Sequence, residues 1–115
     1  MRTVLATFAL AAAAAAAGGV QAADPLPKFK LNTLYSDARA SLLDLGWQPE
    51  SVAASSRTCD GRESTCEAYP EAESCAPLGA AACSMLWKRD GQVISVTTIG
   101  AHDILVRSAS CRSGC

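Results

Sequence analysis

The sequence predicts an α+β fold, in which one N-terminal helix packs on a three-stranded antiparallel β-meander and a long disulfide-stapled loop joins them. Three observations predict it. Apolar residues recur at helical spacing within residues 33–47, and an Asp-Gly pair separates two β-rich runs around residue 90. Four of the six cysteines lie in or beside the segment between these elements. We therefore expect residues 33–115 to form a single small disulfide-rich domain.

Residues 1–22 have the pattern of a secretory signal peptide. Arg2 precedes an apolar run over residues 4–17, and Val20-Gln21-Ala22 fits the small-residue rule for cleavage. The apolar run is shorter than the roughly 20 residues that a membrane-spanning helix needs. We therefore expect cleavage near Ala22, a periplasmic or secreted location, and no membrane span in the mature protein.

The mature chain is small and slightly acidic. About 93 residues remain after cleavage, with nine Lys/Arg against eleven Asp/Glu once Arg2 is removed. A net charge near −2 argues against nucleic acid or an anionic membrane as a partner. A domain of this size has one modest core and gains much stability from cross-links.

The N-terminal part of the mature chain predicts an extended lead-in and then a helix. Residues 23–32 carry two prolines and show no clear period, which indicates extended chain. The helix is expected over residues 33–47, where Thr33 or Ser36 can cap its start and Gly46 is well placed to end it. Its apolar face contains Leu34, Ala38, Leu42 and Leu45, onto which Trp47 is expected to fold back.

Residues 48–82 form the segment that needs cross-linking. They are rich in Ser, Pro, Gly, Ala and acidic residues and show no sustained period, so they predict a loop. A loop of this length is uncommon in a compact domain unless something ties it down. We expect disulfides formed by the cysteines in this segment to hold it in place.

The last third predicts the meander. Asp90-Gly91 lies between two β-rich runs, which is a strong hairpin signal. With these residues at the tip, the expected cross-strand pairs are Arg89–Gln92, Trp87–Ile94, Met85–Val96 and Cys83–Thr98. A third strand over residues 104–111 is expected to return beside the second, with Ile99 opposite Ile104 and Cys111 beside Gln92.

An even number of cysteines in an exported chain indicates a disulfide framework. The expected register separates Cys83 from Cys111 by roughly 20 Å, too far for a bridge between them. The preferred set is local: Cys59–Cys66, Cys75–Cys83 and Cys111–Cys115. In the alternative, Cys111 reaches back to Cys59 or Cys66, which would constrain the unfolded chain by about 4 rather than 2.5 kcal/mol.

The cysteine pattern does not favour a metal or a redox site. Structural zinc sites usually pair ligands two to four residues apart, and only Cys111 and Cys115 come close to that spacing. The C-x-x-C motif of thioredoxin-like proteins does not occur. We therefore expect no metal and no cofactor.

Candidate catalytic residues are scarce. His102, the only histidine, lies in a predicted turn beside Asp103, and no serine stands in a G-x-S-x-G motif. Acidic residues gather instead in the central loop, but without the order of a dedicated calcium loop. They are Asp60, Glu63, Glu67, Glu71 and Glu73. We expect the four glutamates, Glu63, Glu67, Glu71 and Glu73, to form a surface that meets a protein partner.

The sequence resembles a family of small, uncharacterised exported proteins of proteobacterial type. The resemblance lies in three patterns: Tyr35-x-x-Ala38-Arg39-x-x-Leu42-x-x-x-Gly46-Trp47, then Tyr69-Pro70-Glu71 with Cys75, then Cys83-x-x-x-Trp87. The resemblance covers most of the mature chain and implies an exported Cys-rich domain, but no catalytic residue. The helix alone is also similar to the first helix of PASTA domains, which bind cell-wall components.

The sequence therefore favours a non-enzymatic exported binding or accessory module, such as an inhibitor, that meets a protein partner. The first alternative is a structural envelope protein that associates with peptidoglycan. A small hydrolase that uses His102 and the loop acids is the second alternative.

Overall fold

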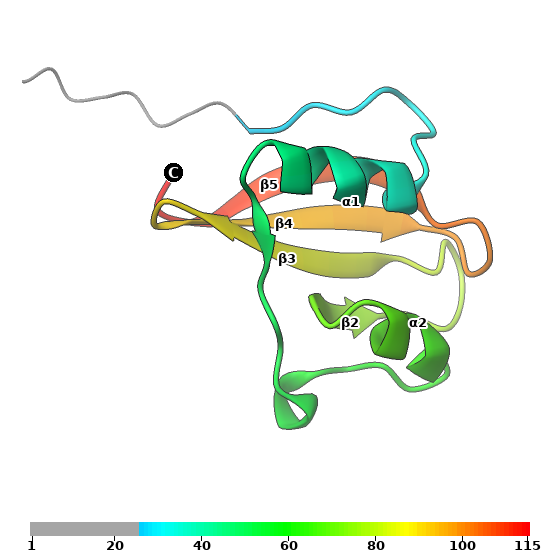
Figure 1. Cartoon of the computed structure of the whole chain (residues 1–115). Coiled ribbons are helices and arrows are strands. Elements are labelled where there is room, and N and C mark those ends of the chain that lie inside the picture. Colours follow the sequence, from blue (N-terminus) through cyan, green and yellow to red (C-terminus); the bar gives the residue numbers. More distant parts are fainter. Residues whose placement is uncertain (1–25) are drawn as a thin grey trace, which may run out of the picture.

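The computed structural model describes residues 26–115, which form an α+β domain with a helix packed on an antiparallel sheet (Figure 1). The expected signal peptide and its cleavage site lie outside these residues. The helices are α1 (Tyr35–Asp44), the short 3₁₀ helix η1 (Ala54–Ser56) and α2 (Glu63–Ala68). The strands are β1 (Gln48–Pro49), β2 (Ala72–Cys75), β3 (Cys83–Arg89), β4 (Gln92–Ile99) and β5 (Leu105–Ser113).

The predicted hairpin is confirmed. Strands β3 and β4 pair with Arg89 opposite Gln92 and Trp87 opposite Ile94, and the register continues to Met85–Val96 and Cys83–Thr98. Asp90 and Gly91 both adopt positive φ at the tip, which is the conformation that a tight hairpin turn requires. The strand β5 then returns antiparallel beside β4, as the sequence predicts.

The register between β4 and β5 differs from the prediction. Ile99 lies opposite Leu105, and two irregularities along the pair shift the later partners further. As a result Cys111 lies opposite Ile94 rather than beside Gln92. A bulge places an extra residue in one strand, and the sequence around Arg107 carries no signal for it.

The expectation of three strands and one helix is wrong in number. The sheet has five strands, because β1 and β2 both pair antiparallel with the edge of β3 that faces away from β4. Strand β1 covers the hairpin-tip half of that edge, and β2 covers the other half. The segment expected as loop also contains η1 and α2. Its strands and helices are too short to show a period in the sequence.

Helix α1 is shorter than predicted and starts differently. Leu34 occupies its N-cap position without a side-chain cap, and the Thr33 hydroxyl donates to the Lys30 carbonyl instead. The backbone N–H of Tyr35 has no acceptor within the helix. It donates to the carbonyl of Ile104, 2.8 Å away, so the chain before β5 provides a hydrogen-bond partner for this end of the helix. Gly46, with φ of 86°, ends the helix as expected.

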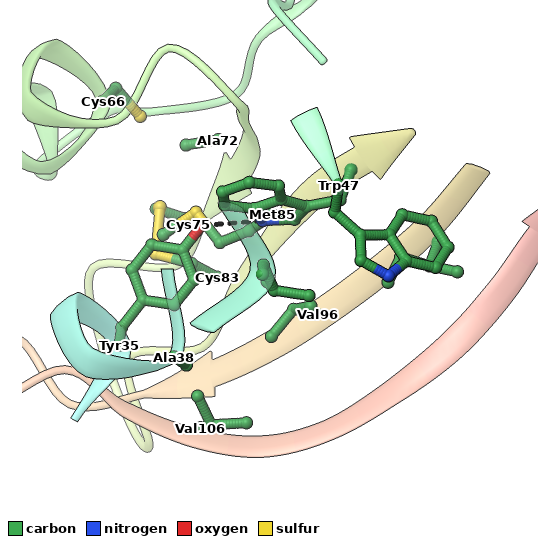
Figure 2. Close-up of a cluster of buried hydrophobic side chains, with 13 residues drawn as sticks. Tyr35, Ala38, Trp47, Cys66, Ala72, Cys75, Cys83, Met85, Val96 and Val106 are labelled. Carbon is green, nitrogen blue, oxygen red and sulfur yellow. Dashed lines mark hydrogen bonds between the residues drawn. A yellow bond between two sulfur atoms is a disulfide. The ribbon is translucent and has the colours of Figure 1, made fainter. Parts of the chain in front are cut away.

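One face of the sheet and one face of α1 enclose the core (Figure 2). Met85, Trp87, Ile94 and Val96 are fully buried on the sheet side. Helix α1 contributes Tyr35, Ala38 and Leu42, whereas Leu34 and Leu45, which were expected on the apolar face, are exposed. Trp47 folds back and is buried, as expected, with its backbone N–H bonded to the Leu42 carbonyl.

Three disulfides cross-link the fold, namely Cys59–Cys66, Cys75–Cys83 and Cys111–Cys115. They are the same three pairs as the preferred local set, in which each cysteine bonds to its neighbour along the sequence. Cys75 and Cys83 lie directly opposite each other on β2 and β3, with Cα atoms 4.1 Å apart. Three disulfides are typical of proteins from an oxidising compartment. Within residues 26–115, none of the helices has the length and apolar character needed to cross a membrane.

Candidate functional site

An acidic hollow lies on the stapled part of the chain, on the side of α2. Its volume is about 300 Å³, and Asp60, Glu63 and Glu67 line it together with Ala54, Arg57 and both cysteines of the Cys59–Cys66 bridge. All three acidic residues are exposed. The bridge joins the chain before α2 to the helix itself, so the carboxylates are held on a cross-linked frame.

Arg62 fixes the start of α2. Its side chain is buried, and its Nη1 atom donates 2.9 Å hydrogen bonds to the carbonyl oxygens of Ala76 and Ala81. Its Nη2 atom donates to the carbonyl of Gly100. One guanidinium thus joins α2 to the loop before β3 and to the turn between β4 and β5.

Arg57 lies in the hollow, but its hydrogen bonds go to the backbone. Its Nε donates to the Ala72 carbonyl, and its Nη2 donates to the carbonyls of Cys66 and Tyr69 near the end of α2. A cation at this end of a helix satisfies carbonyl groups that have no partner within the helix. Arg57 therefore stabilises α2 while the three carboxylates remain exposed around it.

Hydrogen bonds hold one of these carboxylates in its ionised form. The Glu63 carboxylate accepts from the backbone N–H of Glu63 and from that of Gly61, 3.0 Å from Oε1. These bonds lower the pKa of Glu63, because they stabilise the charged form. Glu63 therefore presents an ionised carboxylate to the hollow.

Glu71 is a correction to the predicted partner surface. Its side chain is fully buried, so it cannot belong to an exposed acidic face. The Tyr35 hydroxyl and the Arg39 Nε both donate to its Oε1 atom, at 2.9 and 2.7 Å. An isolated buried carboxylate would be costly, and these two donors on successive turns of α1 reduce that cost at Oε1, while Oε2 has no hydrogen-bond partner among residues 26–115.

Glu73 lies apart from the hollow, on the sheet face opposite α1. It forms a two-pronged pair with Arg112 of β5, with N–O distances of 2.8 and 3.0 Å. The hydrogen bond from Arg112 lowers the pKa of Glu73. The small side chains of Ser84 and Ser95, whose hydroxyls are 2.6 Å apart, lie on the two strands between them. Of the four glutamates predicted to form the surface, only Glu63 and Glu67 line the hollow.

The buried polar cluster around Glu71 brings together residues from three separate parts of the chain. Tyr35 and Arg39 come from α1, Tyr69 and Glu71 precede β2, and Trp87 comes from β3. The Trp87 indole N–H donates to the Tyr35 hydroxyl at 3.0 Å, drawn as the dashed line in Figure 2. The Tyr69 ring packs edge-on against that of Tyr35, with centroids 4.9 Å apart. This cluster joins helix α1, the turn before β2 and strand β3, whose residues lie up to 52 positions apart in the sequence.

Burial gives the cluster unusual electrostatics. Desolvation, and then the nearby Glu71 carboxylate, raise the pKa of Tyr35 well above its ordinary value, so the phenol stays protonated and donates. The hydrogen bond to Glu71 raises the pKa of Arg39. The Arg39 guanidinium lies 5.8 Å from the ring centroids of both Tyr69 and Trp87, within cation–π range. The cluster is therefore an Arg39–Glu71 ion pair within an aromatic setting.

His102 lies on an exposed turn, beside a shallow hollow of about 230 Å³ lined by Ser36, Tyr69 and Asp103 among others. None of the loop acids lines this hollow, so the structure does not bring His102 together with them. Within residues 26–115, no three His, Cys, Asp or Glu side chains gather closely enough to hold a metal ion.

Sequence reasoning missed the roles of Arg57 and Arg62. Both bond to backbone carbonyls, and such bonds leave no recognisable pattern in a sequence. Comparison with protein-family models, curated proteins and solved structures finds no significant match to this chain.

Proposed function

We propose that the protein is an exported, non-enzymatic binding module, a class that includes protein inhibitors, and that the acidic hollow is its contact surface. The observation that carries the proposal is the arrangement of Asp60, Glu63 and Glu67 around a concave surface of about 300 Å³. Their exposed carboxylates complement a partner that presents lysine or arginine side chains. Charge complementarity of this kind steers association and sets specificity.

The frame around the hollow supports this proposal. The Cys59–Cys66 bridge, the backbone bonds of Arg57 and the buried Arg62 fix α2 at both ends. A preordered surface loses little conformational entropy when it binds, so a small patch can still contribute useful affinity. Functional loops are commonly positioned by a rigid scaffold in this way.

The test is affinity capture from an envelope extract with matched baits. The wild-type protein is compared with Asp60→Asn/Glu63→Gln/Glu67→Gln, and with Asp37→Asn/Asp44→Asn as a control that neutralises exposed acids of α1. We expect a cationic partner that is retained by the wild type and the control, released by salt, and lost with the triple variant. Equal retention by all three baits would contradict the assignment of the hollow.

The peptidoglycan alternative needs its own measurement. Purified cell wall is sedimented with each of the same three proteins, and the fraction in the pellet is measured. Co-sedimentation that the triple variant does not reduce would favour the structural envelope role over the proposed one.

A further inference from the structure

A second concave surface lies between the lead-in and β5. Residues 26–31 and Val106–Ala109 line a groove of about 610 Å³. Leu26, Phe29 and Ala109 are partly buried against the core, and Val106 is buried, so the floor of the groove is apolar. Its volume falls within the usual range for small-molecule sites.

The charged residues that line this groove, among residues 26–115, are positive. Lys28, Lys30 and Arg107 line it and are exposed, and none of its lining residues in the described part of the chain is acidic. Within residues 26–115 these three cations take part in no ion pair. The groove therefore combines an apolar floor with cations that have no acidic partner among residues 26–115, although the mature chain has a net negative charge.

We propose that this groove binds a free single-chain amphiphile with an anionic head group, such as a fatty-acid carboxylate. The hydrocarbon chain would lie on Leu26, Phe29 and Val106. The carboxylate would meet the cationic rim of the groove, which is formed by Lys28, Lys30 and Arg107. The rim selects against cationic amphiphiles, because like charges repel. The hollow shape favours one chain over a flat bilayer surface. This proposal is independent of the acidic hollow, with which it shares no lining residue.

The apolar floor and the cationic rim of the groove contribute separately to the affinity for an amphiphile. Each methylene group buried on the floor is worth about 0.8 kcal/mol, which would act on an amphiphile of any head group. The rim adds a preference that depends on charge and that weakens with salt. Binding that discriminates among head groups on one hydrocarbon chain therefore distinguishes the proposed site from a merely apolar surface.

The experiment titrates the protein, purified after export from an expression host, with decanoate below its critical micelle concentration. Decyltrimethylammonium and decyl maltoside carry the same chain on cationic and neutral heads. We expect saturable one-to-one binding of decanoate in calorimetry, with amide NMR shifts at residues 28–31 and 106–109. Cationic decyltrimethylammonium should bind least.

Charge-reversal variants then test the rim. Lys28→Glu, Lys30→Glu and Arg107→Glu lie on exposed positions and should leave the fold intact, which circular dichroism checks. Each should weaken decanoate binding by about fivefold, near the upper limit for an exposed charge pair. Lys88→Glu changes a cation outside the groove and should leave the affinity unchanged.

Three outcomes would overturn the proposal. They are no saturable binding of decanoate, equal binding of the three head groups, and shifts that map away from the groove. Co-sedimentation with phosphatidylglycerol vesicles in the absence of decanoate binding would also overturn it, in favour of contact with a lipid surface.

Discussion

The hydroxyl of Tyr35 donates a 2.9 Å hydrogen bond to the carboxylate of Glu71, 36 positions further along the chain. The same hydroxyl accepts from the Trp87 indole, and the same carboxylate oxygen accepts from Arg39. The Tyr35 hydroxyl oxygen and Glu71 Oε1 thus connect helix α1, the residue before β2 and strand β3. The polar cluster therefore holds the segment of residues 48–82 against the core, in addition to the disulfides.

Loss of the Tyr35 hydroxyl should destabilise the domain measurably. Tyr35→Phe leaves the buried Trp87 N–H without an acceptor and removes one donor from Glu71. We expect the free energy of unfolding to fall by about 2 kcal/mol, because an unsatisfied buried polar group costs about 1–3 kcal/mol. Urea denaturation at pH 7 measures the change.

Tyr69→Phe is the matched control for that variant. It removes a phenol hydroxyl that makes no hydrogen bond within residues 26–115, while the edge-on ring contact with Tyr35 remains. We expect a change within about 0.5 kcal/mol, as for most substitutions away from such features. Equal losses in the two variants would show that the cluster has no special role.

The disulfides should differ in their contribution to stability. Cys75→Ala/Cys83→Ala removes a bridge between buried residues of β2 and β3, and the loop-entropy term alone is about 2.5 kcal/mol. Cys111→Ala/Cys115→Ala removes a bridge between exposed residues that closes a shorter loop, for about 2 kcal/mol at most. The losses are measured by urea denaturation. A larger loss from the terminal pair would contradict this order.

Acid should weaken the contribution of the Glu73–Arg112 pair. The pKa of Glu73 is lowered in the folded state, so its ionised form stabilises the fold above the unfolded pKa of about 4.3. That stabilisation is lost as the pH falls through the lower, folded pKa. We expect Arg112→Gln to cost about 0.5 kcal/mol at pH 7, as for a partly exposed pair, and less at pH 3.

Urea denaturation of the wild type and the variant at both pH values gives the two differences. Arg107→Gln, at an exposed β5 residue without an ion pair among the described residues, serves as the control and should show no such pH dependence. A cost for Arg112→Gln that is the same at pH 3 as at pH 7 would rule out the pair as its source.

Gly100 should tolerate a side chain far less well than Gly79. Both adopt positive φ, of 96° and 66°, so alanine at either position is strained. A Cβ at Gly100 would also lie 2.2 Å from the Asp103 carbonyl oxygen, whereas one at Gly79 would meet nothing within 4 Å. We expect Gly79→Ala to cost about 1 kcal/mol and Gly100→Ala clearly more. Thermal unfolding of both variants tests the difference.

The hairpin was predictable because its signals are local. Asp90-Gly91 sets the turn, and the turn sets the register of Trp87 with Ile94 and of the pairs beyond it. Strands β1 and β2 were not predictable, because two to four residues show no period and owe their structure to the free edge of β3. The shift of Cys111 has two sources, the pairing of Ile99 with Leu105 rather than Ile104 and one irregularity between Thr97 and Thr98, and neither has a clear sequence signal.

The acidic surface was predictable only in part. Glu63, Glu67 and Glu71 look alike in sequence, as acids within one loop-like segment. What separates them is tertiary structure, because Tyr35 and Arg39 of α1 draw Glu71 into the core while α2 presents the other two to solvent. The partners of Glu71 lie more than 30 positions away, beyond the reach of local patterns.

The most direct test of the proposed contact surface is an NMR titration of the ¹⁵N-labelled protein with oligolysine, a probe of the cationic chemistry that the hollow should recognise. The amide shifts of Asp60, Glu63 and Glu67 are compared with those of Asp37 and Asp44 on α1. We predict saturable, salt-sensitive shifts at the hollow that are lost in Asp60→Asn/Glu63→Gln/Glu67→Gln. Shifts spread evenly over both sets of acids, or unchanged in the triple variant, would contradict the account.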